Sequence, residues 1–199
     1  LVILEINPNY PRTFGDHILR LSEVDYLVES DYPVPALPEV PISDKDRTIG
    51  NLVAAQIHDG DCLQLGIGGM PNAIADALYG KKDLGIHTEM MTTNMMNLYK
   101  AGVITGRKKQ IQKGKMVCTF VMGSKELYEF VDDNPMVEVL EGSYTNDPFV
   151  IAQNDNMVSV NSTLAVDLTG QCASESIGSV QFSGTGGQSD TATGAQRSR

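Results

Sequence analysis

The sequence predicts an α/β fold with an open, mostly parallel sheet and flanking helices. Short apolar runs alternate with segments of helical periodicity, a pattern typical of β–α units. The run MVCTFVM at residues 116–122 carries no charge, as in a strand buried on both faces of a parallel sheet. With 199 residues, 41% of them hydrophobic, the chain can bury a core in one or two domains.

The amino-terminal part reads as the end of an earlier domain. Residues 1–6 (LVILEI) and 24–29 predict strands, with a turn-rich stretch at 7–16 between them. Four of the nine prolines lie in residues 32–41, a composition that favours extended backbone. We therefore expect residues 1–41 to be the end of an amino-terminal domain with its linker, and residues 42–199 to be a carboxyl-terminal domain. Because Leu1 already lies in a strand and the end at 194–199 stops within a pattern, we expect a piece of a longer protein.

The elements of the second domain follow in order. Residues 44–58 have apolar side chains at Ile49, Leu52, Val53 and Ile57, the spacing of an amphipathic helix. Residues 62–65 (CLQL) predict a strand. The glycine turn GIGG then leads into the helix MPNAIADALYG, with proline in the first turn and glycine just past the end. Residues 84–88 predict the next strand and 91–101 the next helix.

The remaining elements become richer in strands. We expect residues 116–122 to form one strand and a helix to run from Lys125 to about residue 131, with Ser124 as its N-cap. Further strands are predicted at 136–140, 157–161, 164–168 and 180–182.

Charge and composition exclude several classes of partner. A formal net charge of −10 and a pI near 4.6 repel phosphate backbones, so we expect neither nucleic acid nor an anionic membrane as a partner. No run approaches the roughly 18 apolar residues of a membrane span, and no leader pattern is present. We expect a cytoplasmic protein.

Cysteines and histidines are scattered. The three cysteines (Cys62, Cys118 and Cys172) have no metal-type spacing, which favours a reducing compartment. Two of them lie within apolar runs and are expected to be buried. The three histidines (His17, His58 and His87) are far apart in the chain, so we expect no metal site.

The turn GIGG at residues 66–69 invites a dinucleotide-binding reading. The third glycine of that fingerprint would fall on Pro71, which cannot provide the same close helix–strand packing. Glu89 lies near the place of the ribose-binding acid, so this alternative stays open. A P-loop is excluded because no Gly-Lys-Ser/Thr follows. The turn either presents amides to a ligand or is a tight turn without one. A second loop of this kind, FSGTGGQSD, spans residues 182–190.

Glu89 follows the predicted strand at residues 84–88, at the edge of the sheet where ligands bind in such folds. It is either a solvated acid at the end of a strand or a nucleophile. A glutamate is ionised at neutral pH and can attack an activated acyl group without a base. Amides exposed by the glycine loops are suitable donors to the oxyanion that this attack creates.

The motifs GIGGMPNA, GIHTEM, YTNDP, ASES and QFSGTGGQSD resemble the acetyl-CoA hydrolase/transferase family, and within it the butyryl-CoA:acetate and 4-hydroxybutyrate CoA-transferases. EINPNYPRTFGD and VDYLVES are similar to the end of that family's amino-terminal domain. The resemblance covers nearly the whole chain.

The resemblance assigns roles to individual residues. It makes Glu89 the catalytic glutamate and places the Ile67 amide and Gly186 beside it. CoA-binding positions fall in the two glycine loops: Gly66, Gly68, Gly69, Gly184, Gly187 and Gln188. Gln188 either orients a substrate or caps a turn, and Asn146 and Asp147 either form a turn or line the acyl pocket.

The resemblance also implies the chemistry. A ping-pong mechanism would use a CoA thioester as substrate and pass through a glutamyl-CoA thioester, with no metal and no other cofactor. The partners would be acyl-CoA, short-chain carboxylates and, in the full-length protein, further copies of itself. Two alternatives stay open: hydrolysis of acyl-CoA by the same glutamate, and a CoA- or nucleotide-binding module without chemistry. The likeness at GIHTEM and GTGGQ favours the transferase.

Overall fold

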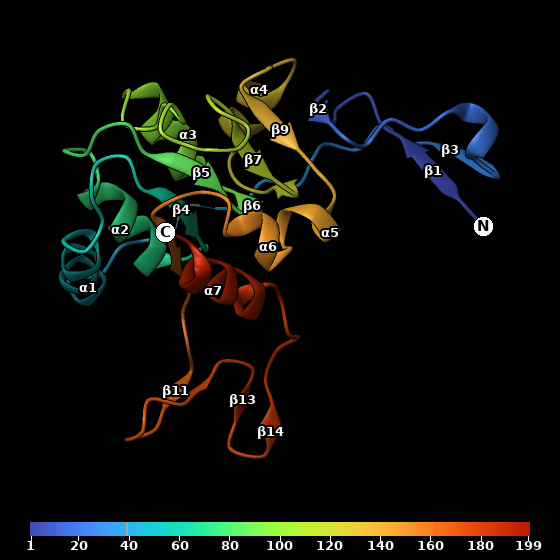
Figure 1. Cartoon of the computed structure of the whole chain (residues 1–199). Coiled ribbons are helices and arrows are strands. Elements are labelled where there is room, and N and C mark those ends of the chain that lie inside the picture. The colour runs from blue at the N-terminus through green and yellow to red at the C-terminus, as the bar shows by residue number, and fades with distance from the viewer. Residues whose placement is uncertain (39) are drawn as a thin grey trace.

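A six-stranded parallel sheet forms the centre of the protein, and the computed structural model describes residues 1–38 and 40–199 (Figure 1). Every neighbouring pair in this sheet is parallel. The strand order is β10 (Met157–Val160), β4 (Cys62–Leu65), β5 (Gly85–His87), β7 (Met116–Cys118), β9 (Val137–Val139) and β2 (Phe14–Gly15). The predicted fold class is confirmed.

The helices form two groups. The first group packs in sequence, each helix against the next: α1 (Asp44–Ala54), α2 (Gly69–Ala77), α3 (Thr93–Lys100) and α4 (Lys125–Val131). The second group comprises α5 (Gly142–Thr145), α6 (Pro148–Ile151) and α7 (Gln188–Arg197), with α7 lying against α6 and β10 (Figure 1). A 3₁₀ turn, η1 (Leu21–Glu23), lies near the amino terminus.

The two sides of the sheet differ in chemistry. In β4, Leu63 and Leu65 join the main apolar core with the first helix group, whereas Cys62 joins a smaller cluster with Ile151 of α6. Gln64 bonds into a polar network that includes Thr191 of α7. Since side chains alternate along a strand, one face of the sheet is apolar and the other carries the polar residues.

Capping residues fix the ends of several predicted elements. The predicted bounds of the strand at residues 62–65 and of the helix at 125–131 are confirmed, and Ser124 Oγ accepts from the amide of Leu127. The helix predicted at 44–58 ends earlier, at residue 54. It begins with a capping box in which Ser43 and Asp46 bond each other's backbone amide.

The prediction of one strand at residues 116–122 is wrong. β7 ends at Cys118, and a separate short strand, β8 (Phe120–Val121), pairs with β6 (Met90–Met91). The reason is a contact with a distant segment, because the amides of Thr119 and Phe120 both donate to the Glu89 carbonyl, at 2.8 and 3.1 Å. Two successive amides on one acceptor interrupt the regular ladder, so β7 ends before Thr119 and a new pairing begins at β8.

The carboxyl-terminal part contains two antiparallel hairpins, β11 (Ala165–Val166) with β12 (Cys172–Ala173) and β13 (Ser176–Ile177) with β14 (Val180–Gln181), which extend away from the body (Figure 1). The strands predicted at residues 164–168 and 180–182 form as the shorter β11 and β14, whereas β12 and β13 were not predicted. The chain then returns as α7, which was not predicted. α5 and α6 were also missed, since each has only four residues and shows no periodicity.

The first residues contribute to two sheets. The two strands predicted at residues 1–6 and 24–29 form as β1 (Ile3–Ile6) and β3 (Tyr26–Glu29), and they pair with each other in parallel. The short strand β2 pairs with β9 at the edge of the central sheet, which the sequence did not indicate.

The domain boundary near residue 41 stays a prediction. Glu39, within the proline-rich stretch, lies outside the described residues, and among those described no helix is long and apolar enough to cross a membrane.

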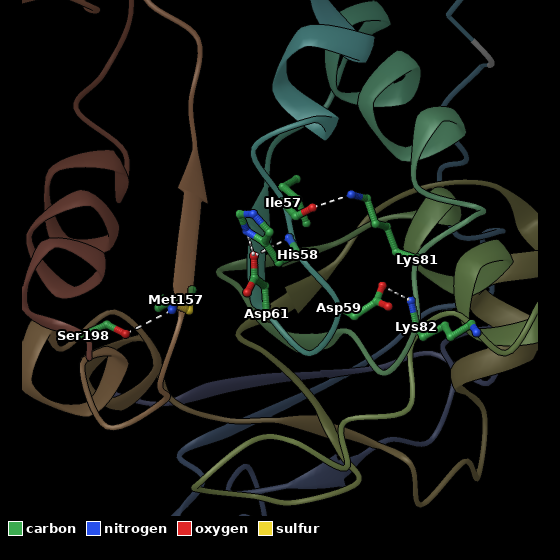
Figure 2. A network of polar contacts seen from close by, with 8 residues as sticks. All are labelled: Ile57, His58, Asp59, Asp61, Lys81, Lys82, Met157 and Ser198. Atoms are coloured by element: carbon green, nitrogen blue, oxygen red, sulfur yellow. Dashed lines mark hydrogen bonds and ion pairs between the residues drawn. The ribbon is translucent and has the colours of Figure 1, made fainter.

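Polar contacts join the turns at the amino edge of the sheet (Figure 2). The Lys81 ammonium donates to the Ile57 carbonyl, and the Lys82 amide donates to Asp59 Oδ1 at 2.8 Å, so the end of the α2 region is tied to the turn before β4. On the other side, Ser198 Oγ accepts from the Met157 amide at 3.0 Å. These bonds hold the edge opposite to the one where the strands end.

Lys109 is buried on the polar side of the sheet, where its stem packs against Gly85. Its ammonium donates to the Lys115 carbonyl at 3.0 Å. Burial lowers the pKa of Lys109 to about 8, although the nearby Cys62 and Glu138 act in the opposite direction.

The first prediction concerns stability as a function of pH. Between pH 8 and 10.5 the unfolded chain keeps the Lys109 proton that the folded chain has lost, so the free energy of unfolding should rise with pH across this window, by on the order of 3 kcal/mol. Lys109→Met retains the packing of the stem and removes this contribution. Urea unfolding at several pH values should therefore give a difference between parent and variant that grows from pH 8 to 10.5. A difference that stays constant with pH would contradict the assignment.

Candidate active site

A cavity of about 260 Å³ lies at the carboxyl edge of the central sheet. Its walls come from the ends of β4 and β5, from Phe120 in β8 and from the loops before α7. Glu89, which follows β5, lines it, as predicted for a strand-end acid in such a fold. The segment that carries Glu89 is therefore held between two strand ends and a loop from far along the chain.

The carboxylate of Glu89 has a defined partner. Asn146 Nδ2 donates to Glu89 Oε2 at 3.0 Å, and the side chain of Glu89 is half-buried. The backbone carbonyl of the same residue accepts the two amides at the break between β7 and β8. Both the side chain and the backbone of Glu89 are thus fixed by hydrogen bonds.

Gly187 lies directly against this carboxylate. A Cβ at this position would overlap with Glu89 Oε2 and would lie 2.6 Å from Asn146 Nδ2. The backbone of Gly187 has φ −96°, which other residues adopt readily. Its glycine is therefore required by the close approach of the carboxylate and not by the backbone conformation.

The second glycine loop forms one wall of the cavity. Gly184, Gly186, Gly187 and Gln188 all line it. Gly186 has φ +60°, a conformation that favours glycine. Gln188 is the first residue of α7 and lines the cavity, so the partial positive charge at the start of this helix lies at the cavity wall. Its Nε2 lies 3.5 Å from Glu175 Oε1.

The first glycine loop is divided between two hollows. Gly66 lines the cavity of Glu89 and also an adjoining hollow of about 200 Å³, which Ile67 and Gln188 line as well. Gly68 and Gly69 line neither hollow. Gly68 is the N-cap of α2 with φ +113°, and Gly69 opens the helix against Asp46.

A network of neutral side chains forms the floor of the cavity. Ser159 Oγ donates to Gln64 Oε1 at 2.7 Å and lies 3.0 Å from Thr191 Oγ1, and Asn161 Nδ2 donates to Gln64 Oε1 at 3.1 Å. Gln64 is buried although it lies in an otherwise apolar strand. That interruption of the apolar pattern was a usable signal in the sequence, and it was not recognised.

His87 is a buried residue that contacts the segment of Asn146 and not the cavity itself. It is 1% exposed, and Nε2 lies 2.9 Å from the Thr145 carbonyl. Burial lowers the pKa of His87 to about 4, although the bond to Thr145 acts in the opposite direction. The imidazole is therefore neutral near pH 7.

Cysteines do not contribute to this site. Cys62 and Cys118 are buried as expected, and burial raises the pKa of each thiol to about 12. Across the described ranges, no group of three or more histidine, cysteine or acidic side chains could hold a metal ion.

Comparison with known proteins identifies the family. Residues 123–199 match the acetyl-CoA hydrolase/transferase C-terminal domain. The chain is 51% identical over its whole length to a 4-hydroxybutyrate coenzyme A transferase of Clostridium kluyveri, of which it covers 46%. The chain belongs to the acetyl-CoA hydrolase/transferase family.

Other members of the family agree in sequence and in structure. The chain is 41% identical over 98% of its length to the butyryl-CoA:acetate CoA-transferase of Anaerostipes caccae, of which it covers 45%. It superposes on the crystal structure of a 4-hydroxybutyrate CoA-transferase from Porphyromonas gingivalis with a TM-score of 0.89 and 42% identity, covering 100% of this chain and 47% of that one. RipA from Yersinia pestis gives a TM-score of 0.89 at 39% identity, covering 99% of this chain and 44% of that one. The chain thus spans about half the length of the relatives that it matches.

Within this family fold, the residues that the resemblance singled out do not all meet. Glu89, Gly66, Gly184, Gly186, Gly187 and Gln188 line one cavity, Ile67 lines the adjoining one, and Gly68 and Gly69 begin a helix. Asn146, for which the sequence left a turn and a pocket role open, contacts the carboxylate directly. It is also the C-cap of α5, as a turn residue would be, and it lines neither of the two hollows.

The second prediction tests the packing at Gly187. Gly187→Ala should displace the Glu89 carboxylate or the loop, because overpacking of this kind costs about 1–3 kcal/mol. A crystal structure of the variant should show the distance from Asn146 Nδ2 to Glu89 Oε2 beyond hydrogen-bond range. Gly184→Ala is the matched control, since its Cβ would meet no atom within 4 Å. An unchanged distance in Gly187→Ala would refute the steric argument.

Proposed function

We propose that Glu89 is the nucleophile of a CoA-transferase that exchanges CoA between short-chain carboxylic acids. The observation that carries this proposal is the carboxylate of Glu89, held by Asn146 against the backbone of Gly187 in a cavity at the carboxyl edge of the sheet. The names of the relatives support the same class of reaction, since two of them are a 4-hydroxybutyrate and a butyryl-CoA:acetate CoA-transferase.

The proposed reaction begins with a covalent step. An oxygen of Glu89 attacks the thioester carbonyl of acyl-CoA, CoA leaves as a thiolate, and a mixed anhydride remains. The thiolate then attacks the glutamyl carbonyl, which releases the first carboxylate and leaves a glutamyl-CoA thioester. An incoming carboxylate reverses both steps and departs as the new acyl-CoA. No other cofactor takes part in these steps.

Backbone amides of the two glycine loops are the proposed donors to the oxyanions of this sequence. Ile67 lines the adjoining hollow and Gly186 lines the cavity of Glu89, and their backbone amides are the donors that we propose. Gly66, Gly68, Gly69, Gly184, Gly187 and Gln188 are the proposed positions along which CoA lies. The remote part of CoA would supply binding energy for the attack by a weakly nucleophilic carboxylate.

Two other functions compete with this one. A hydrolase would use the same glutamate but would admit water to the anhydride. A binding module would hold CoA or a nucleotide without forming any bond to Glu89. The two experiments below separate the three, using the protein expressed from its complete reading frame.

The third prediction concerns Glu89 itself. Glu89→Gln keeps the shape of the side chain and removes the nucleophile, so the exchange rate should fall at least about 1,000-fold. In the parent protein, incubation with acyl-CoA followed by borohydride should give a reduced product at Glu89 by peptide mass spectrometry. Glu129→Gln, on the exposed surface of α4, is the control and should be labelled like the parent. An unlabelled Glu89 in a protein without exchange activity would leave the binding module, whereas full exchange in Glu89→Gln would refute Glu89 as the nucleophile.

The fourth prediction separates the transferase from the hydrolase. With acyl-CoA alone, the parent protein should release at most about one equivalent of carboxylate per site, because the glutamyl-CoA thioester waits for an acceptor. Added acetate should restore continuous turnover and form acetyl-CoA. Continuous release of acid and free CoA without an acceptor would identify a hydrolase.

A further inference from the structure

We propose that His87 is a positioning residue, which holds Asn146 and through it sets the orientation of the Glu89 carboxylate. The inference rests on the proposed nucleophilic function of Glu89 and extends it to a residue that lines neither of the two hollows. It rests on two hydrogen bonds that join the segment of His87 and Glu89 to the segment of Thr145 and Asn146.

The chain of contacts has two bonds. His87 Nε2 lies 2.9 Å from the Thr145 carbonyl, and the next residue, Asn146, donates from Nδ2 to Glu89 Oε2 at 3.0 Å. His87 is the last residue of β5, and Glu89 follows two residues later, before β6. The strand end and the turn after α5 are therefore clamped together at two adjacent points.

The bond from His87 has one direction. A carbonyl oxygen can only accept, so Nε2 carries the proton and donates it to Thr145. The imidazole is neutral near pH 7, because burial keeps its pKa low. Nδ1 is then the unprotonated nitrogen, and it has no hydrogen-bond partner among the described residues.

Apart from its bond to Glu89 and the close approach of Gly187, the side chain of Asn146 has no hydrogen-bond partner among the described residues. Its backbone amide donates to the Gly142 carbonyl at 2.9 Å within the single turn of α5, while its buried Oδ1 has no partner among the described residues. A helix of one turn has little stability of its own. The position of Asn146 thus depends on where the Thr145 carbonyl is held, which is the contact that His87 makes.

Glutamine and asparagine at residue 87 both carry an amide but differ in length, so the two variants test whether the side chain must reach the Thr145 carbonyl. Glutamine can place its Nε2 near the position of the imidazole Nε2, whereas asparagine is one methylene shorter and cannot reach the Thr145 carbonyl. His87→Asn should lower kcat for exchange about 10- to 100-fold, the size expected when a reacting group is displaced by about 1 Å, with little change in KM for acyl-CoA. His87→Gln should recover most of the rate.

A double-mutant cycle with Asn146→Ala provides the readout that a merely structural role would not give. If His87 acts through Asn146, His87→Asn should slow exchange in the parent but cause no further loss of kcat in Asn146→Ala. It should still lower the melting temperature in both backgrounds. Leu98→Ala, in the apolar core of α3, is the control for lost stability and should lower the melting temperature without changing kcat.

Three outcomes would overturn the inference: full kcat in His87→Asn, equal losses in the glutamine and asparagine variants, or losses that multiply in the double mutant. The failure of the proposed function is distinct from these. In that case Glu89→Gln would retain exchange, whatever the substitutions at residue 87 do.

Discussion

The close approach between the Glu89 carboxylate and the backbone of Gly187 is the constraint on which the site depends. The two residues lie on segments separated by most of the second half of the chain, and no side chain fits between them. The chain that leaves β10 must therefore return from its two hairpins to the carboxyl edge of β5. α7 makes that return rigid, because its Gly194 packs against Ile151 of α6 and its first turn borders the cavity.

One face of the sheet packs the apolar core, and the other carries the polar side chains near Glu89. Leu63 and Ile86 point into the apolar core under the first helix group, and this face accounts for most of the buried apolar surface. Gln64 and His87, which alternate with them, face the second helix group and make specific polar bonds. Parallel strands end at one edge, so the polar residues of neighbouring strands converge there without any further element.

The sequence predicted what local chemistry determines and missed what distant contacts determine. The strand at Cys62–Leu65 and the helix capped by Ser124 are fixed by burial pattern and capping, and both were predicted with the correct bounds. The break at Thr119 arises from bonds to the Glu89 carbonyl, which lies between β5 and β6, and no local pattern encodes it. The same reason explains why Glu89 could be singled out by its place after a strand, whereas the bond from Asn146 could not.

The partners of Glu89 share one further property, which is that they are neutral. The carboxylate is bonded by the amide of Asn146 and lies against the backbone of Gly187, and the uncharged imidazole of His87 contacts the residue before Asn146. The ion pairs found in the described parts of the chain do not involve this carboxylate. A guanidinium partner would bind both oxygens strongly and would have to be displaced before attack. The neutral Asn146 donor fixes the direction of the side chain and leaves its negative charge uncompensated, which suits a carboxylate that is to act as a nucleophile.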